Sequence, residues 1–408
     1  MPAPVRHLPL LVATLALGQA VGWGTTYYMP SVLAPALARV LGLDPTGIYL
    51  GVTIMVALGG LASPFAGRLL DRNGAARLMP VAPIAIGLGH LLVASFPSAI
   101  TWWAAWVLHG LAMPFGLTLA VTTYLTRTSG ASARRTIGIL TLLVSFTPTA
   151  FWPLTALLDG QLGWRGTLFV YAGLELGLLL PLQIWIGRGW SDRDPVAATA
   201  GSGGVPAAPV PTFSPRAKKV AITALVVMFT TQGFASWGLP LHLIALFQEM
   251  GLGRAEAVAI ASASGAATIA ARTIEVGFGH HMRTLTMAVV AVASLTPVLA
   301  LLVAPIDLTL AAWIFIVVWS GANGILAVLR MTLPLTLFGA EAYGTLVGRM
   351  SLPQNLAFAA APAIFAMVIQ ARGTTGALEL AIAASLVALV AAIVLARVGR
   401  QAERPAPH

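Results

Sequence analysis

The sequence predicts an all-α membrane protein whose twelve transmembrane helices form two pseudo-symmetric six-helix bundles. Of the 408 residues, 58% are hydrophobic and 9% are charged, and the mean hydropathy is +0.88. A soluble globular protein has about a quarter of its residues charged. The apolar stretches are about 20 residues long, which is the length of helix that crosses a bilayer. A polar segment near the middle of the chain divides them into two equal sets.

Short connections between the predicted helices make sequential helices antiparallel neighbours. The first bundle, residues 1–187, is expected to contain helices at 9–38, 46–69, 78–96, 99–126, 137–158 and 166–187. Residues 188–217 are rich in Gly, Pro, Ala and Ser, which is typical of a flexible linker, here on the cytoplasmic side. The second bundle with a short tail, residues 218–408, is expected to contain helices at 218–248, 256–279, 284–304, 308–337, 345–371 and 376–397.

The two halves of the chain repeat short motifs at matching positions. Gly22-Trp23-Gly24 in the first helix corresponds to Ser236-Trp237-Gly238 in the seventh. Leu41-Gly42-Leu43 corresponds to Met250-Gly251-Leu252 ahead of the next helix. A duplicated six-helix unit is typical of secondary transporters with parallel repeats, which bind substrate near the bilayer midplane between the repeats.

The basic residues predict that both termini are cytoplasmic. In that orientation the outer loops hold only four of the 23 Lys and Arg residues, namely Arg39, Arg165, Arg254 and Arg372. The opposite orientation would violate the positive-inside rule. The net charge of +10 is then explained by the membrane, and nucleic acid is not an expected partner. We expect a multi-pass monomer in a bacterial inner membrane, with three tryptophans anchoring the fourth helix at the interface: Trp102, Trp103 and Trp106.

The sequence lacks the motifs of enzymes. It has no cysteine, and the patterns H-E-x-x-H, G-x-S-x-G and G-x-x-x-x-G-K-[ST] are absent. These patterns mark zinc hydrolases, serine hydrolases and nucleotide-phosphate sites. We therefore expect no catalytic residues, no metal and no cofactor, and a secondary transporter needs none of them.

A run of charges follows the second predicted helix: Gly67-Arg68-Leu69-Leu70-Asp71-Arg72-Asn73-Gly74-Ala75-Ala76-Arg77. Gly67 is expected to let a neighbouring helix come close, Asp71 to accept hydrogen bonds, and Gly74 to permit a reversal with positive φ. The run resembles the G-x-x-x-D-R-x-G-R-[RK] loop of the major facilitator superfamily, with alanine at 75 and 76 in place of basic residues. The resemblance implies a cytoplasmic gating loop formed by Gly67, Asp71, Arg72 and Gly74.

Two arginines are predicted to lie at bilayer depth in the second bundle, where an ionisable residue costs about 2.5–3.5 kcal/mol on insertion scales. The eighth helix carries a polar face: Ser264, Thr268, Arg272 and Glu275. The tenth carries another: Trp319, Asn323 and Arg330. Two arginines with one carboxylate favour an anionic substrate. As alternatives, Arg272 and Glu275 neutralise each other, and Arg330 extends to the cytoplasmic headgroups.

The arginine and acid of the eighth helix are similar to a pair in the monocarboxylate-transporter branch of the superfamily. The arginine of that branch holds the substrate carboxylate. The stretch from Thr141 to Thr155, followed by Gly163-Trp164-Arg165, resembles bacterial members related to that branch. The fifth helix lacks the glycine-proline signature of drug exporters, and the first helix lacks the lysine of the animal branch. The resemblance implies a small organic anion, of the monocarboxylate class, as substrate.

Further polar side chains are expected to line a substrate cavity together with Arg272 and Arg330: Asn323, Tyr27, Tyr28, Gln232 and Asn355. Interhelical hydrogen bonding or packing is the alternative role for these residues. Glu275 is the expected proton carrier, because its protonation would release Arg272 for the anion. His109 is a second carrier, with a helix-to-helix hydrogen bond as its alternative.

The sequence thus predicts a secondary active transporter that moves a small organic anion by alternating access, coupled to protons. An exporter or uniporter of a neutral or amphiphilic solute is the alternative, with the arginines in a structural role. A membrane receptor or lipid-handling protein that does not transport is a third reading, and it would need a soluble domain or long outer loop that the sequence does not show.

Overall fold

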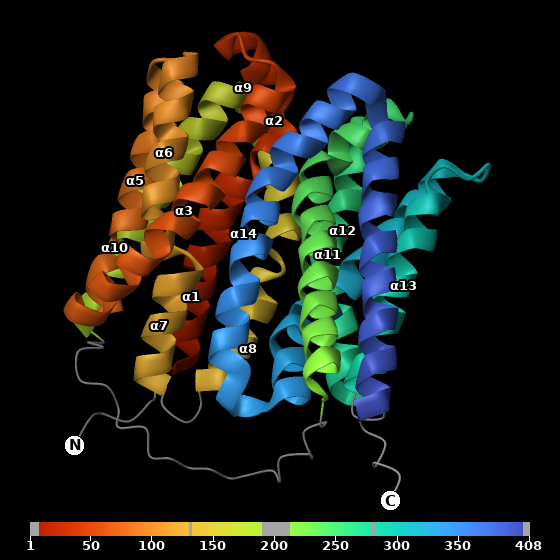
Figure 1. Ribbon diagram of the computed structural model, residues 1–408. Coiled ribbons are helices and arrows are strands. Elements are labelled where there is room, and N and C mark those ends of the chain that lie inside the picture. Colours follow the sequence, from red (N-terminus) through yellow and green to blue (C-terminus); the bar gives the residue numbers. More distant parts are fainter. Residues whose placement is uncertain (1–7, 130–132, 190–212, 279–281, 403–408) are drawn as a thin grey trace, which may run out of the picture. The chain divides into compact units, whose positions relative to one another are not determined.

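The computed structural model describes residues 8–129, 133–189, 213–278 and 282–402, which are helical apart from short connections (Figure 1). The chain divides into two compact units, Met1–Gly203 and Gly204–His408. Most of the linker expected at 188–217 lies outside the described residues. Each unit has its own set of packed helices.

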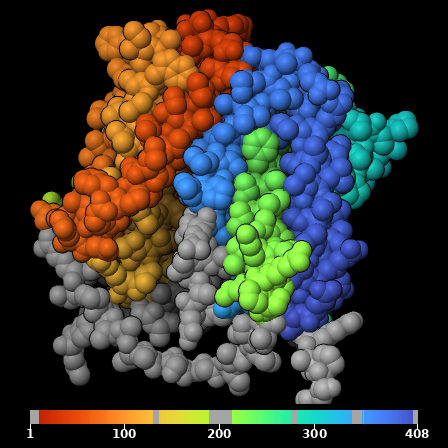
Figure 2. All heavy atoms as spheres, viewed as in Figure 1, coloured from red at the N-terminus to blue at the C-terminus, as the bar shows by residue number. Residues whose placement is uncertain are grey.

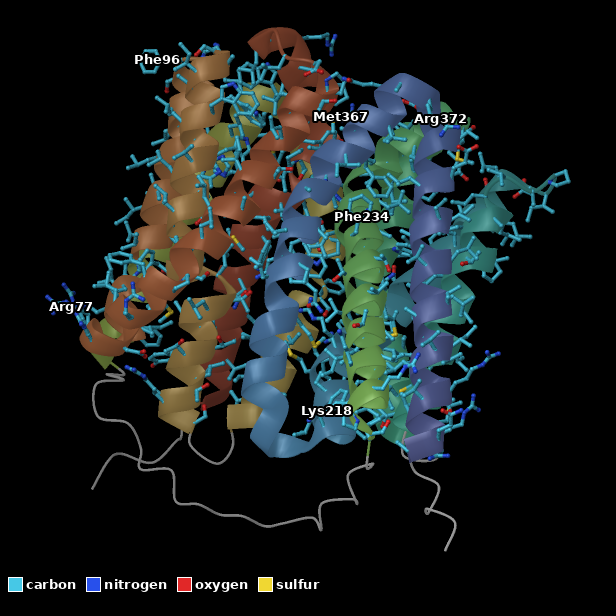
Figure 3. All side chains as sticks on the ribbon, viewed as in Figure 1. Arg77, Phe96, Lys218, Phe234, Met367 and Arg372 are labelled. Carbon is cyan, nitrogen blue, oxygen red and sulfur yellow. The ribbon has the colours of Figure 1, made fainter. Side chains whose placement is uncertain are left out.

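The first unit is built from α-helices interrupted by the π-helical segments η1 and η3. Its elements are α1 (Leu8–Trp23), η1 (Gly24–Tyr28), α2 (Pro30–Leu41), α3 (Pro45–Asn73), α4 (Ala75–Leu78), α5 (Val81–Ser95), α6 (Ala99–Gly116), α7 (Thr118–Ser129), α8 (Ala133–Val144), α9 (Thr147–Gly173), η3 (Leu174–Leu179) and α10 (Leu180–Gly189). Arg77 and Phe96 lie near opposite ends of α5, as expected for a helix that crosses a membrane (Figure 3).

The second unit consists of α11 (Pro215–Glu249), α12 (Arg254–Phe278), α13 (Thr284–Leu301) and α14 (Leu308–Ala402).

In the described part of the chain, nine stretches are long and apolar enough to cross a membrane. Two of them, Thr136–Arg188 and Leu352–Ala402, have the length of two crossings and contain a glycine with positive φ, Gly163 and Gly373. Together with the first helix, formed by α1, η1 and α2, these stretches give the twelve spans that the sequence predicts.

Local sequence explains where several helices begin and break. Asp44 caps α3 by accepting a hydrogen bond from the Gly47 amide at 2.8 Å. The fifth predicted helix is broken between α8 and α9, because Pro148 in the first turn of α9 has no amide to continue the helical hydrogen bonds. The fourth is broken between α6 and α7 at Leu117, whose φ and ψ are −93° and −142°. The sequence predicts one unbroken helix at 99–126, so the break at Leu117 is a correction. At 137–158 the two prolines predict a kinked helix, and the structure has a break there instead.

The tryptophans of α6 are packed inside the first unit, and the prediction that they anchor the interface is wrong for two of the three. Trp102 and Trp106 are 1% and 0% exposed, with ring centroids 5.3 Å apart. Gly51 of α3 makes room for Trp106, since a Cβ there would lie 2.4 Å from Nε1 of that ring. Close packing between α3 and α6 therefore fixes these rings.

A glycine contact also joins η1 to α9. A Cβ on Gly24 would lie 2.2 Å from Cδ1 of Phe151, so the ring packs directly on the backbone of η1. We expect Gly24→Ala to lower the stability of the protein by about 1–3 kcal/mol, because the ring would have to move. Thermal unfolding in detergent measures the effect.

The matched control is Gly60→Ala in α3, where no described atom lies within 4 Å of the added carbon. Alanine favours the helix over glycine by about 1 kcal/mol, so this variant should be as stable as the natural protein or slightly more stable. Equal unfolding midpoints for the two variants would contradict the close contact at Gly24.

Candidate functional site

Polar side chains from α11, α12 and α14 meet inside the second unit. Thr268 of α12 donates through Oγ1 to the Ser320 carbonyl of α14 at 3.2 Å. One turn further along α14, a Cβ on Gly324 would lie 2.9 Å from Cγ2 of Thr268. The two backbones therefore approach closely, and a hydrogen bond joins them, as is common between helices in a membrane. This contact brings the polar faces of α12 and α14 together.

Two amide side chains that the sequence predicts for the site contact each other. Gln232 of α11 donates through Nε2 to Oδ1 of Asn323 on α14. Asn323 in turn donates through Nδ2 to the Trp319 carbonyl at 2.8 Å, one turn earlier in α14. The pair therefore makes the interhelical bond that was the alternative reading, and it also fixes the orientation of Asn323.

Arg272 is half-buried on α12 and points its side chain towards α14. Its Nε donates to the Gly324 carbonyl at 3.2 Å. Within the described residues its terminal amino groups donate no hydrogen bond. Glu275 lies one turn away and is half-buried, but no ion pair within 4 Å joins it to Arg272 in this part of the chain. The backbone thus orients the guanidinium and leaves its terminal donors available.

Arg330 lies on the same face of α14 as Asn323, two turns further along. Its guanidinium carbon is 5.5 Å from the ring centroid of Phe358, a distance at which the positive charge is attracted to the ring face. Phe358 stacks on Trp237 of α11, with centroids 5.6 Å apart and planes at 4°. Among the described residues Arg330 donates no hydrogen bond. Asn355 is exposed three residues before Phe358 on the same helix.

The predicted site residues of the first unit lie in packed surroundings. Tyr27 and Tyr28 are on η1 with ring centroids 5.0 Å apart, and Tyr28 is 5.5 Å from Trp152. Tyr27 is 5% exposed, so it belongs to the aromatic core of this unit. His109 is buried on α6, with Nε2 3.3 Å from the Ile86 carbonyl of α5. His109 therefore makes the helix-to-helix contact that was its alternative role.

Glu175 is a buried acid that the sequence reading overlooked. It is 1% exposed on η3, and one of its carboxylate oxygens accepts a hydrogen bond from Oγ1 of Thr25 on η1 at 2.8 Å. A signal existed in the sequence, because Glu175 is the only acidic residue in the predicted helix 166–187. An acid at this depth is as costly as the two arginines and requires the same explanation.

The predicted gating loop is largely helical. α3 continues through the charged run and ends before Gly74, whose φ of 85° provides the expected reversal. Asp71 accepts a hydrogen bond from Nη2 of Arg127 on α7 at 2.7 Å, and Arg72 is exposed. The expectation for Gly67 is wrong, since no described atom lies within 4 Å of the position of its Cβ. The contact between α3 and α7 is made by side chains instead.

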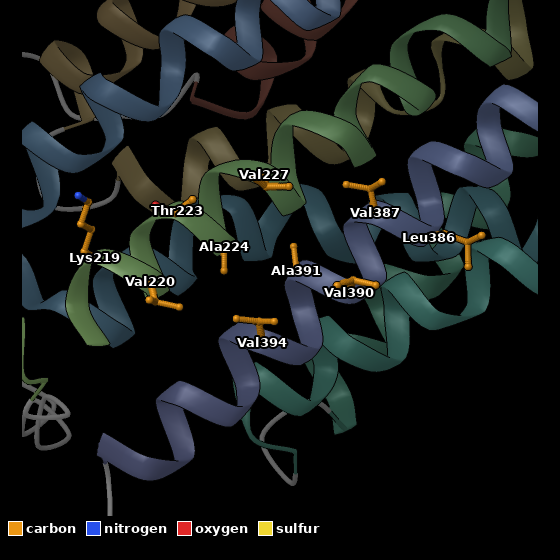
Figure 4. A pocket seen from close by; sticks show the side chains of 10 residues that line it. All are labelled: Lys219, Val220, Thr223, Ala224, Val227, Leu386, Val387, Val390, Ala391 and Val394. Carbon is orange, nitrogen blue, oxygen red and sulfur yellow. The ribbon is translucent and has the colours of Figure 1, made fainter. Parts of the chain in front are cut away.

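A separate apolar groove of about 590 Å³ lies between α11 and the last part of α14 (Figure 4). These two segments lie side by side on the face shown in Figure 2. Valine, leucine and alanine line most of the groove, and Lys219 and Thr223 are the polar side chains among the described residues that line it. None of the predicted substrate-binding residues lines it, so it is distinct from the polar cluster.

The family of the chain follows from comparison with known proteins. Residues 15–362 match the family model of the Major Facilitator Superfamily. The chain belongs to this superfamily. As a major facilitator protein it is a multi-pass membrane transporter for small molecules and not an enzyme.

Solved structures of other major facilitator proteins share the fold. A bacterial homologue of the human lysosomal transporter Spinster, inward-facing and occupied, has a TM-score of 0.73 at 14% identity, with 100% of both chains covered. Its unoccupied form gives 0.71 at 15% identity, again with 100% of both chains covered. The nucleoside transporter NupG gives 0.72 at 12% identity, covering 96% of this chain and 99% of that chain. None of the curated proteins matches this chain.

The bond between Gln232 and Asn323 gives a test of the cluster. We expect Gln232→Leu to lower stability by about 1–3 kcal/mol, because the side-chain oxygen of half-buried Asn323 loses its donor. Replacing both residues by leucine should cost less than the sum of the single changes, since no polar partner is then left unpaired. Thermal unfolding of the two single variants and the double variant measures this coupling. Strictly additive effects would contradict the contact.

Proposed function

We propose that this major facilitator protein is a proton-coupled secondary transporter of a small organic anion of the monocarboxylate class. The observation that carries the proposal is the pair Arg272 and Arg330, whose outer guanidinium donors are not used by any described residue. Both arginines lie in apolar spans, Arg254–Glu275 and Leu308–Phe338. An arginine binds a carboxylate through paired charge-assisted hydrogen bonds, so an anionic ligand would satisfy both groups.

The neighbours of the arginines suit a small ligand. Asn323 lies on the face of α14 that carries Arg330, and Gln232 bonds to it from α11, the helix that also carries Trp237. The exposed amide of Asn355 lies one turn from Phe358. These groups supply hydrogen bonds and an apolar surface beside the positive charge, which is the mixture that small-molecule sites use.

Glu275 is the proposed proton carrier. It lies one turn from Arg272 without an ion pair to it in the described chain, so it is close enough to compete with a substrate carboxylate for the same charge. Protonation would remove that competition and favour anion binding. The movement of the anion would then be coupled to the movement of the proton. His109 is a weaker proposal, because its ring is already bonded to α5.

The proposed mechanism is alternating access by the two repeated bundles, with both termini in the cytoplasm of a bacterial cell and the chain in the inner membrane as a monomer. The charge distribution supports the orientation. Four of the 23 basic residues lie in the expected outer loops, Arg272 and Arg330 lie within spans, and the other 17 lie at or near the expected cytoplasmic face. Reading 1–187 and 218–408 as the two bundles, joined by 188–217, is part of the same proposal.

A neutral or amphiphilic solute is the second proposal, and the stacked rings of Trp237 and Phe358 favour it. Aromatic surfaces bind planar or apolar molecules without requiring a charge. The arginines would then have a structural role. A thermal-shift screen of the purified protein against small carboxylates, nucleosides, sugars and amphiphilic drugs separates the two proposals, because only the anion proposal requires stabilisation by carboxylates.

We expect Arg272→Gln and Arg330→Gln each to weaken carboxylate binding by roughly 10- to 100-fold, the equivalent of losing a charged hydrogen bond of about 1.5–3 kcal/mol. Isothermal titration with the carboxylate that gives the largest thermal shift measures the change. Arg397→Gln is the control, because that arginine is exposed at the end of the same unit and should not alter binding. Unchanged affinity in both test variants would exclude the anion site.

We expect Glu275→Gln to abolish accumulation driven by a pH gradient while retaining exchange of labelled for unlabelled substrate. Exchange needs no net proton movement, whereas accumulation does. Reconstituted vesicles with and without an imposed gradient provide both measurements. Gradient-driven accumulation at the natural level in this variant would remove Glu275 from the coupling mechanism.

A further inference from the structure

The first unit holds a carboxyl group that the proposed substrate site does not use. Glu175 is 1% exposed, and its hydrogen-bond partner is the hydroxyl of Thr25, 150 residues away in the chain. Both residues lie on π-helical segments, Thr25 on η1 and Glu175 on η3. Such segments are rare and occur frequently at functional sites. The hydrogen bond between Thr25 and Glu175 therefore joins the π-helical turn of the first span to that of the sixth span.

The surroundings of Glu175 are tightly packed. A Cβ on Gly87 of α5 would lie 2.6 Å from Cγ of Leu176 and 3.2 Å from Cβ of Glu175. Thr25 is itself 0% exposed, and its neighbour Gly24 is packed against Phe151. The carboxyl group consequently has little room for the water that would solvate a negative charge.

No positive group within ion-pair distance accompanies this carboxyl in the described part of the chain. η3 packs against α1, α5, α9 and α10, and η1 lies against α9. The described titratable and charged groups on these elements are Tyr27, Tyr28, His90, Asp159, Arg165, Tyr171 and Arg188. Arg165 and Arg188 are ten and thirteen residues from Glu175, which corresponds to about 15 Å and about 20 Å along a helix.

The histidine on α5, His90, has no ion-pair partner among the described residues. His90 lies one turn beyond Gly87, with its ring 6.0 Å from that of Tyr171 and 5.0 Å from that of His109 on α6. Nε2 of His90 is buried without a hydrogen bond. A pair of buried imidazoles in contact does not supply a stable positive charge, because burial disfavours the charged form of each.

We propose that Glu175 is a proton-binding site, occupied while η1 and η3 are packed together and vacated when they separate. An ionised carboxylate buried without a cation costs several kcal/mol, so the packed arrangement requires the neutral acid. Loss of the proton to water leaves a carboxylate that is stable only when hydrated, and hydration requires η1 to move away from η3. The proton therefore controls the contact between the first and sixth membrane spans.

The proton itself needs no substrate, so this inference stands apart from the anion site. It depends on the proposed function in one respect, namely that the proton would contribute to driving transport. Glu175 and Glu275 are then two separate acids, one in each unit, and each can be changed without altering the other.

Infrared difference spectroscopy of the purified protein tests the protonation directly. Between about pH 6 and about pH 9, a range in which an ordinary carboxyl group is ionised throughout, we expect a carbonyl band of a protonated carboxyl group that is lost on raising the pH. Glu175→Gln should remove the band, and the matched variant Glu275→Gln should keep it. A spectrum without a Glu175 band at any pH, or with a band that never changes, would overturn the proposal.

Thermal unfolding provides a second measurement. An acid that keeps its proton in the folded state and loses it on unfolding makes the folded state less stable as pH rises. The unfolding midpoint of the natural protein should therefore fall over this pH range relative to that of Glu175→Gln, which is expected to fold because glutamine can keep the bond to Thr25. Parallel curves for the two proteins would contradict the proposal.

Binding and uptake measurements separate this inference from the anion site. If Arg272→Gln and Arg330→Gln leave carboxylate binding intact, the anion site is wrong, yet the infrared and unfolding results for Glu175 keep their meaning. If the Glu175 band is absent while carboxylate uptake persists, the proton site is wrong and the anion site remains.

Discussion

The constraint on which this structure depends is that a bilayer offers no water to a polar group. Every backbone amide and carbonyl at bilayer depth must therefore be satisfied within the protein, which explains why the described residues are helical. The same constraint makes each buried charge costly, so that a charge persists in a span only when packing or function requires it. The arginines of the second unit and the acid of the first are understood in this way.

Close backbone contact provides the framework for these charges. Gly324 allows α14 to approach α12, and its carbonyl then accepts the hydrogen bond that orients Arg272. Gly24 and Gly87 serve the first unit in a similar way, since Phe151 packs on the backbone of Gly24, beside Thr25, and Leu176, beside Glu175, packs on the backbone of Gly87. In both units small residues set the distance between helices, and the polar contacts follow from that distance.

The two units differ in the kind of ionisable group that they hold without a charged partner. Arg272 and Arg330 leave positive charge in the second unit, whereas Glu175 places an acid in the first without a cation at ion-pair distance among the described residues. A small anion would neutralise the former and a proton the latter. A transporter that binds both would therefore have each charge balanced only when loaded, which is the arrangement that coupled movement requires.

The sequence by itself determined the spans and the residues that are costly within them, because hydropathy and charge depend on composition along a single helix. It identified Arg272 and Arg330 for this reason. Tertiary structure decided which neighbours meet. Helix packing brings Gln232 to Asn323 across 91 residues and Thr25 to Glu175 across 150. It also buries Trp102 and Trp106 and leaves Gly67 without a close neighbour among the described residues. Helical periodicity specifies the face on which a residue lies, but the partner of that face depends on how separate helices pack.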